Sequence, residues 1–351
     1  MNKVEVTSKM IDYRQWQGST ADELGYGTGN QYPSLSYRHK ADNGQQINVF
    51  VVDGRRSDSD PTIIGSTSYD YRIDDMLKAQ TTIIAHQATA RVITAEWHGV
   101  TIDVKDPRHT AGDFITVPQL VANAMGDFDS IALSQLEAID SVVDLSAVGP
   151  IRLQAESLGT VAIAAMLRVL SEDRFRKTVS VSDVAIIESV NSYGDGQFLR
   201  PLRILKQLKN IETPLRECYY DENRIIGHSA ITAFGRMSRK NKAIREFLTK
   251  KQQLSANSPA VGLHKSLHSA LAAGLAGNES FRNIPITFYR GSDSSVSLES
   301  DLISAAEALL ELGGNARVVN LVAGPGDETK IGHHFATSLG RQASFAQLLR
   351  G

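Results

Sequence analysis

Short apolar runs alternate with segments of helical periodicity along most of this 351-residue chain. The alternation predicts strands at 61–65, 91–97, 151–157, 179–190, 284–291 and 316–324, and helices at 74–90, 133–148, 160–170, 298–314 and 335–349. Strands that alternate with helices at this spacing build a mostly parallel sheet with helices on both faces. The chain is therefore predicted to be an α/β protein.

A β-hairpin is expected to precede this alternation. Two β-rich runs, 36–42 and 45–54, flank the turn signal Asp42-Asn43-Gly44. Residues 1–35 are polar and rich in glycine, so we expect an N-terminal extension without a firm element there.

The alternation stops between 191 and 283, where the sequence is helix-like and basic. Thirteen Arg and Lys residues against five Asp and Glu residues give residues 200–251 a net charge of +8. We expect a core made of 36–190 and 284–351, interrupted by a helical cap at 191–283. The basic charge either lies on solvated helix faces or favours an anionic substrate or surface.

Composition excludes several classes of protein. The hydrophobic fraction is 42%, and 37 basic against 39 acidic residues leave a net charge of −2, so neither disorder nor a nucleic-acid partner is expected. No apolar run approaches the roughly 18 residues of a membrane span, and no secretory signal opens the sequence; we expect a cytoplasmic protein. The single cysteine, Cys218, excludes an intramolecular disulfide and a cysteine-based zinc site.

The most informative motif is Ala155-Glu156-Ser157-Leu158-Gly159, at a point where a predicted strand passes directly into a predicted helix. A nucleophile on such a turn has a strained backbone, and small flanking residues prevent collisions there. The turn also places the serine hydroxyl at a helix N-terminus, which favours developing negative charge. The alternative interpretation is that Ser157 is an ordinary helix N-cap.

This motif and the order of the predicted elements resemble the α/β-hydrolase fold superfamily, of the serine hydrolase type that includes esterases and lipases. The resemblance runs from about Ser36 to the C-terminus, and residues 91–99, RVITAEWHG, match the family's fourth strand. Triads of the family follow the chain order serine, acid, histidine. The resemblance implies a mostly parallel central sheet, helices on both faces and a cap.

The resemblance also implies the positions of the acid and the base. Asp293 follows a strand in the pattern Gly-x-Asp, and Glu188, at the end of an earlier strand, is the alternative acid. His333 is preferred as the base because the family often has Gly-His here, and His334 is the alternative. Without a catalytic role, Asp293 would cap the following helix, and the histidines would lie on the surface.

The oxyanion hole would consist of two backbone N–H groups. The resemblance assigns them to Leu158, directly after the nucleophile, and to Ser66, with Thr67 as the second choice. The family's His-Gly signature is absent from this loop.

Together these residues predict hydrolysis of an ester or related acyl bond of a small molecule, through a Ser-His-Asp triad and an acyl-enzyme. We expect no metal and no organic cofactor. The alternative is a catalytically silent protein that uses the same fold for binding.

Overall fold

The computed structural model describes residues 4–11, 34–40, 46–66, 75–97, 117–157, 159–189, 267–294, 297–325, 331 and 339–350. The predicted histidines His333 and His334, the oxyanion residues Leu158 and Thr67, and Cys218 lie outside these ranges.

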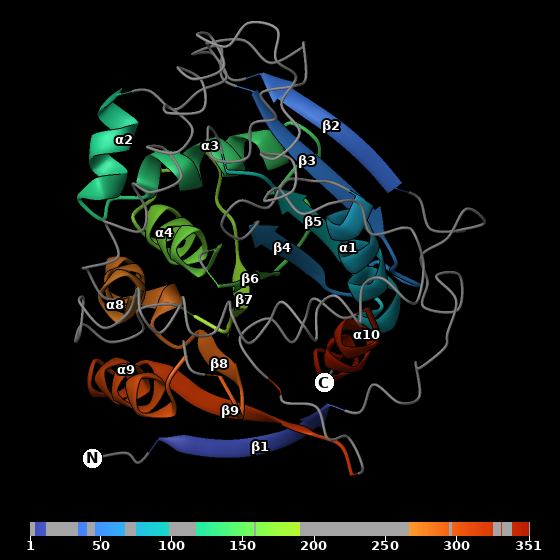
Figure 1. The fold of residues 1–351 in the computed structure, drawn as a ribbon. Helices are drawn as coiled ribbons and strands as arrows, with labels where there is room; N and C mark the ends of the chain where they lie inside the picture. Colours follow the sequence, from blue (N-terminus) through green and yellow to red (C-terminus); the bar gives the residue numbers. More distant parts are fainter. Residues whose placement is uncertain are drawn as a thin grey trace, which may run out of the picture.

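The described strands form one sheet of nine strands in the order β1-β9-β8-β7-β6-β4-β5-β3-β2 (Figure 1). Pairing is antiparallel between β2 and β3 and between β3 and β5, and parallel elsewhere. The strands are β1 Glu5–Ile11, β2 Ser34–Lys40, β3 Gln46–Asp53, β4 Thr62–Ser66, β5 Arg91–Ala95, β6 Ile151–Glu156, β7 Val181–Ile187, β8 Pro285–Gly291 and β9 Asn315–Ala323. The expected mostly parallel sheet is confirmed, as is the hairpin pairing of β2 with β3.

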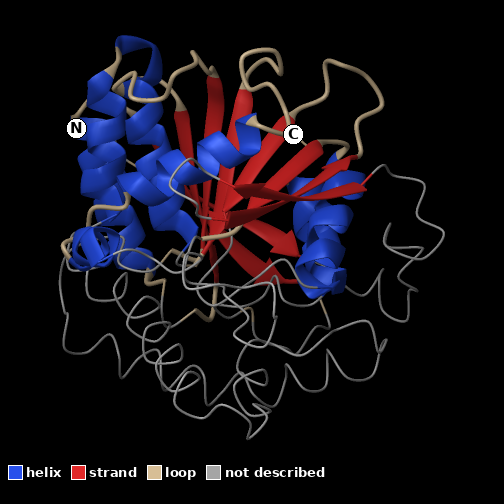
Figure 2. Ribbon diagram, turned by 90° about the horizontal axis from the view of Figure 1, so that it is seen from above, coloured by secondary structure: helices blue, strands red, loops and turns tan. Residues whose placement is uncertain are grey.

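Helices cover both faces of the sheet (Figures 1 and 2). Helices α3, α4, α8 and α9 contribute to one buried cluster, and α1 and α10 to the other. The helices are α1 Asp75–Ala88, α2 Val117–Ala124, α3 Asp129–Asp140, α4 Gly159–Ser171, α8 Leu267–Gly277, α9 Glu299–Glu311 and α10 Leu339–Leu348, with a short 3-10 turn at Glu279–Phe281. None of the described helices is long and apolar enough to cross a membrane.

The period of two in β3 divides the core between the two helical layers. Val49 and Val51 are buried in the cluster that contains α3 and α4, whereas Phe50 and Val52 are buried in the cluster that contains α1. Successive side chains of a strand point to opposite faces. A strand buried on both faces is therefore apolar at nearly every position, as its sequence shows.

Strand β1 was not expected. It pairs in parallel with β9 at one edge of the sheet, with Ile11 opposite Ala323. Most of its side chains are exposed, and Ile11 is the only buried residue within the strand. An exposed edge strand lacks the apolar pattern by which strands are predicted, so the expectation of no firm element in this region is corrected.

Helix α3 ends earlier than its apolar pattern predicted. Asp140 is its last residue, and Val142 and Val143, expected on the same helical face, lie in the following turns. The buried Asp140 carboxylate accepts the N–H of Leu145 at 3.1 Å and pairs with Lys177 at 2.8 Å. A side chain that binds the backbone beyond the helix stabilises its termination. Helix α2 lies between the predicted elements 91–97 and 133–148, where no element was predicted.

The last part of the expected cap packs on the core. Helix α8 lies against α4, and a side chain added to Gly274 would lie 3.0 Å from the Leu167 side chain. The expected cap residues before 267 lie outside the described ranges.

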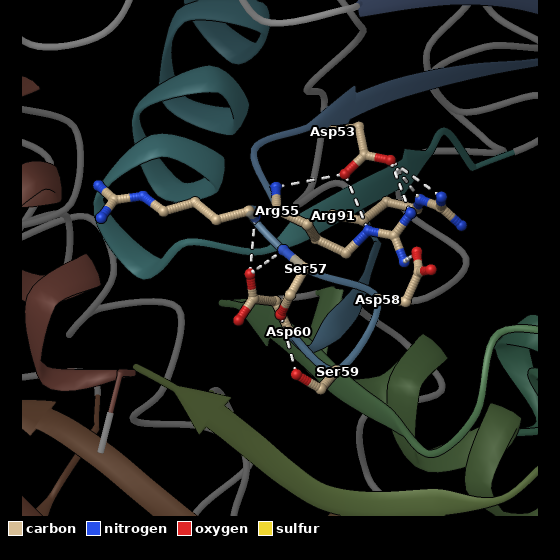
Figure 3. Close-up of polar contacts among 8 residues, drawn as sticks. Asp53, Arg55, Ser57, Asp58, Ser59, Asp60 and Arg91 are labelled. Carbon is tan, nitrogen blue, oxygen red and sulfur yellow. Dashed lines mark hydrogen bonds and ion pairs between the residues drawn. The ribbon is translucent and has the colours of Figure 1, made fainter.

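At the amino ends of the parallel strands, a polar cluster fixes the connection from β3 to β4 (Figure 3). The Asp53 carboxylate accepts hydrogen bonds from Arg55 at 2.9 Å and from Arg91 at 3.0 Å. Asp60 accepts the backbone N–H of Ser57 at 2.9 Å. This cluster lies at the amino ends of the parallel strands, whereas Ser157 lies at their carboxyl ends. It therefore bears on stability rather than on the site.

Candidate active site

Three residues singled out in the sequence follow neighbouring parallel strands. Ser157 comes directly after β6, Glu188 directly after β7, and Asp293 shortly after β8. The carboxyl ends of parallel strands meet at one edge of the sheet, where sites of open α/β sheets lie. The fold therefore brings Ser157 and both predicted acids to the same edge.

Ser157 occupies a strained turn. Its φ angle is 54°, in the left-handed region that non-glycine residues seldom adopt. The backbone N–H of Ser157 donates to the carbonyl of Ile187 at 2.9 Å, and its carbonyl accepts the Thr160 hydroxyl at 2.6 Å. These bonds hold the strained residue between β6 and the start of α4. Strain of this kind concentrates at functional sites, and a strained strand-to-helix turn is the geometry that the motif predicted.

Ser66, the predicted oxyanion residue of the neighbouring loop, lies beside this turn. It ends β4 and is in register with Ala155. Its buried hydroxyl accepts hydrogen bonds from Trp97 Nε1 at 2.8 Å and from Gln135 Nε2 at 3.1 Å. Gln135 also donates to the carbonyl of Ala95 at 3.1 Å, so the end of β4 is fixed to that of β5.

The role of Gln135 and Trp97 was not foreseen in the sequence. Gln135 is fully buried on α3, among the apolar positions from which that helix was predicted. The sequence around Gln135 does not indicate its hydrogen-bond partner, because that partner, Ser66, lies 69 residues away.

Glu188 is the most buried of the candidate acids. It is 0% exposed and has a φ of 48°, so it too occupies a strained strand end. Its Oε2 accepts the Ser294 hydroxyl at 2.6 Å, and its Oε1 accepts the backbone N–H of Gly291. Burial raises the pKa of Glu188 to about 8, although these hydrogen bonds and the nearby Arg290 act in the opposite direction.

A second buried carboxyl lies next to the nucleophile. Burial, with a smaller contribution from the charge of Glu188, raises the pKa of Glu156 to about 8. Burial thus disfavours the charged form of both carboxyls and raises both pKa values above those of solvent-exposed carboxyls. The strained turn of Ser157 therefore lies between two carboxyls that are easier to protonate than exposed ones.

Asp293 has a different environment. Its side chain is exposed to solvent. Its Oδ2 accepts the N–H of Ile331 at 3.2 Å, and its own N–H donates to the carbonyl of Ile331 at 3.0 Å. Ile331 precedes Gly332-His333 in the sequence, so these bonds attach Asp293 to the chain two residues before the predicted base.

The described residues contain no cluster of three or more His, Cys, Asp or Glu side chains that could hold a metal ion. The described residues grouped around Ser157 are a hydroxyl, two carboxyls and hydrogen-bonded backbone groups, whereas the predicted histidine base lies outside the described residues.

No protein-family model matches the chain, and no curated protein matches it. Among solved structures, the thioesterase domain from the curacin biosynthetic pathway matches with a TM-score of 0.50 and 13% identity, covering 91% of this chain and 100% of that domain. A carboxyl esterase from the fungus Tuber melanosporum matches at a TM-score of 0.49 and 10% identity, covering 100% of this chain and 91% of that one. Brefeldin A esterase, a bacterial homologue of human hormone sensitive lipase, matches with a TM-score of 0.48 and 12% identity, covering 91% of this chain and 74% of that one.

The sheet order and the match to the thioesterase domain define one class of protein: the chain has the α/β-hydrolase fold. The antiparallel β2–β3 hairpin, the parallel strands that follow and the turn after β6 are the elements by which the sequence resembled this class.

Proposed function

We propose that this protein is a serine hydrolase that cleaves an ester or a related acyl bond of a small molecule. The observation that carries the proposal is the backbone of Ser157, a non-glycine residue with a φ of 54° between a buried strand and a helix N-terminus. A strained turn is retained only where the surrounding structure enforces it, and strain of this kind clusters at active sites.

The proposed reaction has two steps. In the first, His333 accepts the proton of the Ser157 hydroxyl, and the Ser157 oxygen attacks the acyl carbon; the leaving alcohol departs with that proton. In the second, His333 activates a water molecule that hydrolyses the acyl-enzyme. The N–H groups of Leu158 and Ser66 would stabilise the oxyanion in both steps.

Asp293 is the proposed acid of the triad. Its role is to orient the imidazole and to stabilise the imidazolium formed when Ser157 loses its proton. The bonds between Asp293 and Ile331 support this assignment because they attach the carboxylate to the segment that leads to His333. Glu188 is the alternative acid, and His334 the alternative base.

A fluorophosphonate probe tests the proposal directly, together with p-nitrophenyl esters of increasing acyl length. The wild-type protein should be labelled, and Ser157→Ala should abolish labelling and lower kcat by several orders of magnitude. Ser134→Ala is the matched control, since Ser134 is also buried, and among the described residues its hydroxyl donates to the Ser130 carbonyl within α3. Folded wild-type protein that neither reacts with the probe nor hydrolyses any ester would instead favour a silent binding protein.

Four variants assign the partners of Ser157. His333→Ala and Asp293→Asn should each lower kcat strongly, whereas His334→Ala and Glu188→Gln should leave most of it. A severe effect of His334→Ala with a silent His333→Ala would transfer the base to His334.

A further inference from the structure

The turn that carries Asp293, residues 291–294, is held by three buried polar residues that the proposed mechanism does not use. These are Glu188 from the end of β7, Arg290 from the end of β8, and Ser294 from the turn itself. All three are at most 6% exposed. We call residues 291–294 the acid turn.

Ser294 connects the parts of this arrangement. Its hydroxyl donates to Glu188 Oε2 at 2.6 Å and accepts the N–H of Ser297 at 3.1 Å. Its N–H donates to the carbonyl of Gly291 at 2.9 Å, which closes the turn. One side chain therefore joins the acid turn to β7 and to the start of the following helix.

Arg290 holds the same turn through backbone carbonyls. Its guanidinium donates to the carbonyls of Ser297 at 2.9 Å and of Ser292 and Ser294 at 3.3 Å each. It also pairs with Glu299 at 3.2 Å. The planar guanidinium presents several donors in a fixed geometry, so it binds three backbone carbonyls between residues 292 and 297 at once.

We propose that Glu188, Ser294 and Arg290 are positioning residues that hold the acid turn in the geometry in which Asp293 meets the histidine. The inference rests on the proposed function. It makes Glu188 a residue that holds the acid turn by hydrogen bonds, and it leaves Asp293 as the acid of the triad. Residues that are locked by their own hydrogen bonds hold a catalytic group to within fractions of an ångström, and a misplacement of 1 Å can lower a rate about 100-fold.

Two observations separate Glu188 from the acid of the triad. Each of its carboxyl oxygens already accepts a hydrogen bond from the acid turn. Burial also raises its pKa and so disfavours the negative charge that stabilises an imidazolium. The exposed Asp293 has no comparable burial.

The decisive comparison is between Glu188→Gln, Glu188→Met and Asp293→Asn. Glutamine keeps one acceptor for the Gly291 N–H, and its amide can donate to the Ser294 hydroxyl, whose oxygen can accept a second hydrogen bond besides the one from Ser297. Glu188→Gln should therefore lower kcat by no more than about three-fold. Glu188→Met has no such groups and should lower kcat about 10- to 100-fold at unchanged KM. Asp293→Asn should lower it about 10⁴-fold, as the loss of a triad acid does.

Ser294→Ala and Ser294→Thr provide a second pair, since threonine retains the hydroxyl. The alanine variant should lower kcat, and it should also lower the pKa of the acid limb of kcat/KM, because a displaced Asp293 stabilises the imidazolium less. The threonine variant should restore both. A side chain that only stabilises the fold would change the melting temperature and leave this pKa where it is.

The inference is overturned if Glu188→Gln is as severe as Asp293→Asn, or if Ser294→Ala leaves kcat and its pH profile unchanged. Hydrogen exchange separates this failure from a failure of the proposed function. The amides of Asp293 and Ile331 are bonded across the acid turn, so they should exchange faster in Ser294→Ala and Glu188→Met than in the wild-type protein, whether or not it cleaves esters. Unchanged exchange in both variants would also overturn the inference.

Discussion

Two neighbouring residues of the site, Ser157 and Glu188, both have left-handed backbones, with φ angles of 54° and 48°. Neither is a glycine, and the ends of β6 and β7 bind one another there, since the Ser157 N–H donates to Ile187. An L side chain in this region costs about 1 to 3 kcal/mol. The sequence thus retains non-glycine residues with a strained backbone at two adjacent strand ends.

This strain predicts an order of stability among serine variants. Ser157→Gly should be more stable than Ser157→Ala by about 1 kcal/mol, because glycine adopts a positive φ without steric cost. Both variants should lack activity. Ser134, inside α3, is the matched control: there alanine should be more stable than glycine by about 1 kcal/mol. Urea denaturation measures all four variants, and a Ser157→Ala variant at least as stable as Ser157→Gly would contradict the strain.

The buried carboxyls predict how stability depends on pH. The pKa of Glu188 rises from 4.5 to about 8 on folding, so between these values the unfolded chain has lost a proton that the folded chain keeps. Its contribution to stability is present below pH 4.5 and falls as the pH rises toward 8. Glu188→Gln removes this titration and should flatten the decline, by up to about 1.4 kcal/mol per pH unit.

Denaturation at intervals from pH 4 to 9 checks this prediction, and Asp144 provides a control of opposite sign. A hydrogen bond from Lys177 lowers the pKa of Asp144 to about 2, so its contribution is lost only as the pH falls below about 4. Asp144→Asn should therefore leave the decline above pH 4.5 unchanged. An equal decline in wild-type protein and Glu188→Gln would show that Glu188 is ionised throughout.

At the scale of the elements, the end of β8 depends on a glycine. A Cβ atom added to Gly291 would lie 2.1 Å from the carbonyl oxygen of Ile331. That carbonyl also accepts the N–H of Asp293 at 3.0 Å, so the close approach of the two backbones forms part of the site.

Gly291→Ala should therefore lower both stability and kcat. Gly54 offers a matched control, since its added Cβ would lie 2.3 Å from the Ala85 carbonyl. This contact lies at the amino ends of the parallel strands, away from Ser157. Gly54→Ala should be destabilised comparably but keep its kcat when assayed well below its melting temperature. If both variants, once folded, had the same kcat as the wild-type protein, the backbone contact would have no role in catalysis.

Hydrophobic periodicity was sufficient to predict the elements that are buried on the expected faces. The runs at 61–65 and 284–291 became β4 and β8 because a strand covered on both faces must be apolar. The strained turn at Ser157 was predictable because its geometry requires small residues on both sides of the serine within a short stretch of sequence.

The elements that escaped prediction depend on distant partners. Strand β1 exists through its pairing with β9, more than 300 residues away. The end of α3 depends on Lys177, which binds Asp140 from beyond α4. The positioning role of Ser294 depends on Glu188, 106 residues away. A single sequence predicts local patterns, and these contacts are not local.

At the scale of the whole molecule, the N-terminal strand lies at the opposite edge of the sheet from the hairpin that follows it (Figure 1). Strand β1 covers the edge of β9, and the Ile11 carbonyl accepts the N–H of Gly324 at 3.2 Å, where the chain leaves β9. An unpaired edge strand is a site of aggregation, so this pairing protects the strand that leads toward the predicted histidines.

The side chain of Ile11 packs this edge strand against the core. It is 0% exposed and belongs to the buried cluster that also contains Ile331, to which Asp293 is bonded, and Phe345 of α10. Met10, next to it on the same strand, is 50% exposed. The strand therefore offers one buried and one exposed side chain at adjacent positions of the same edge.

Truncation of these two side chains separates packing from strand pairing. Ile11→Ala should lower the free energy of unfolding by about 2 to 4 kcal/mol, because it leaves a cavity between β1, β9 and α10. Met10→Ala should change it by less than about 0.5 kcal/mol, since an exposed site leaves no cavity. Urea denaturation of both variants measures the difference. Equal and small effects would mean that β1 contributes backbone pairing alone, whereas a large effect confined to Ile11 would establish that the side chain of the N-terminal strand stabilises the buried cluster of Ile331 and Phe345.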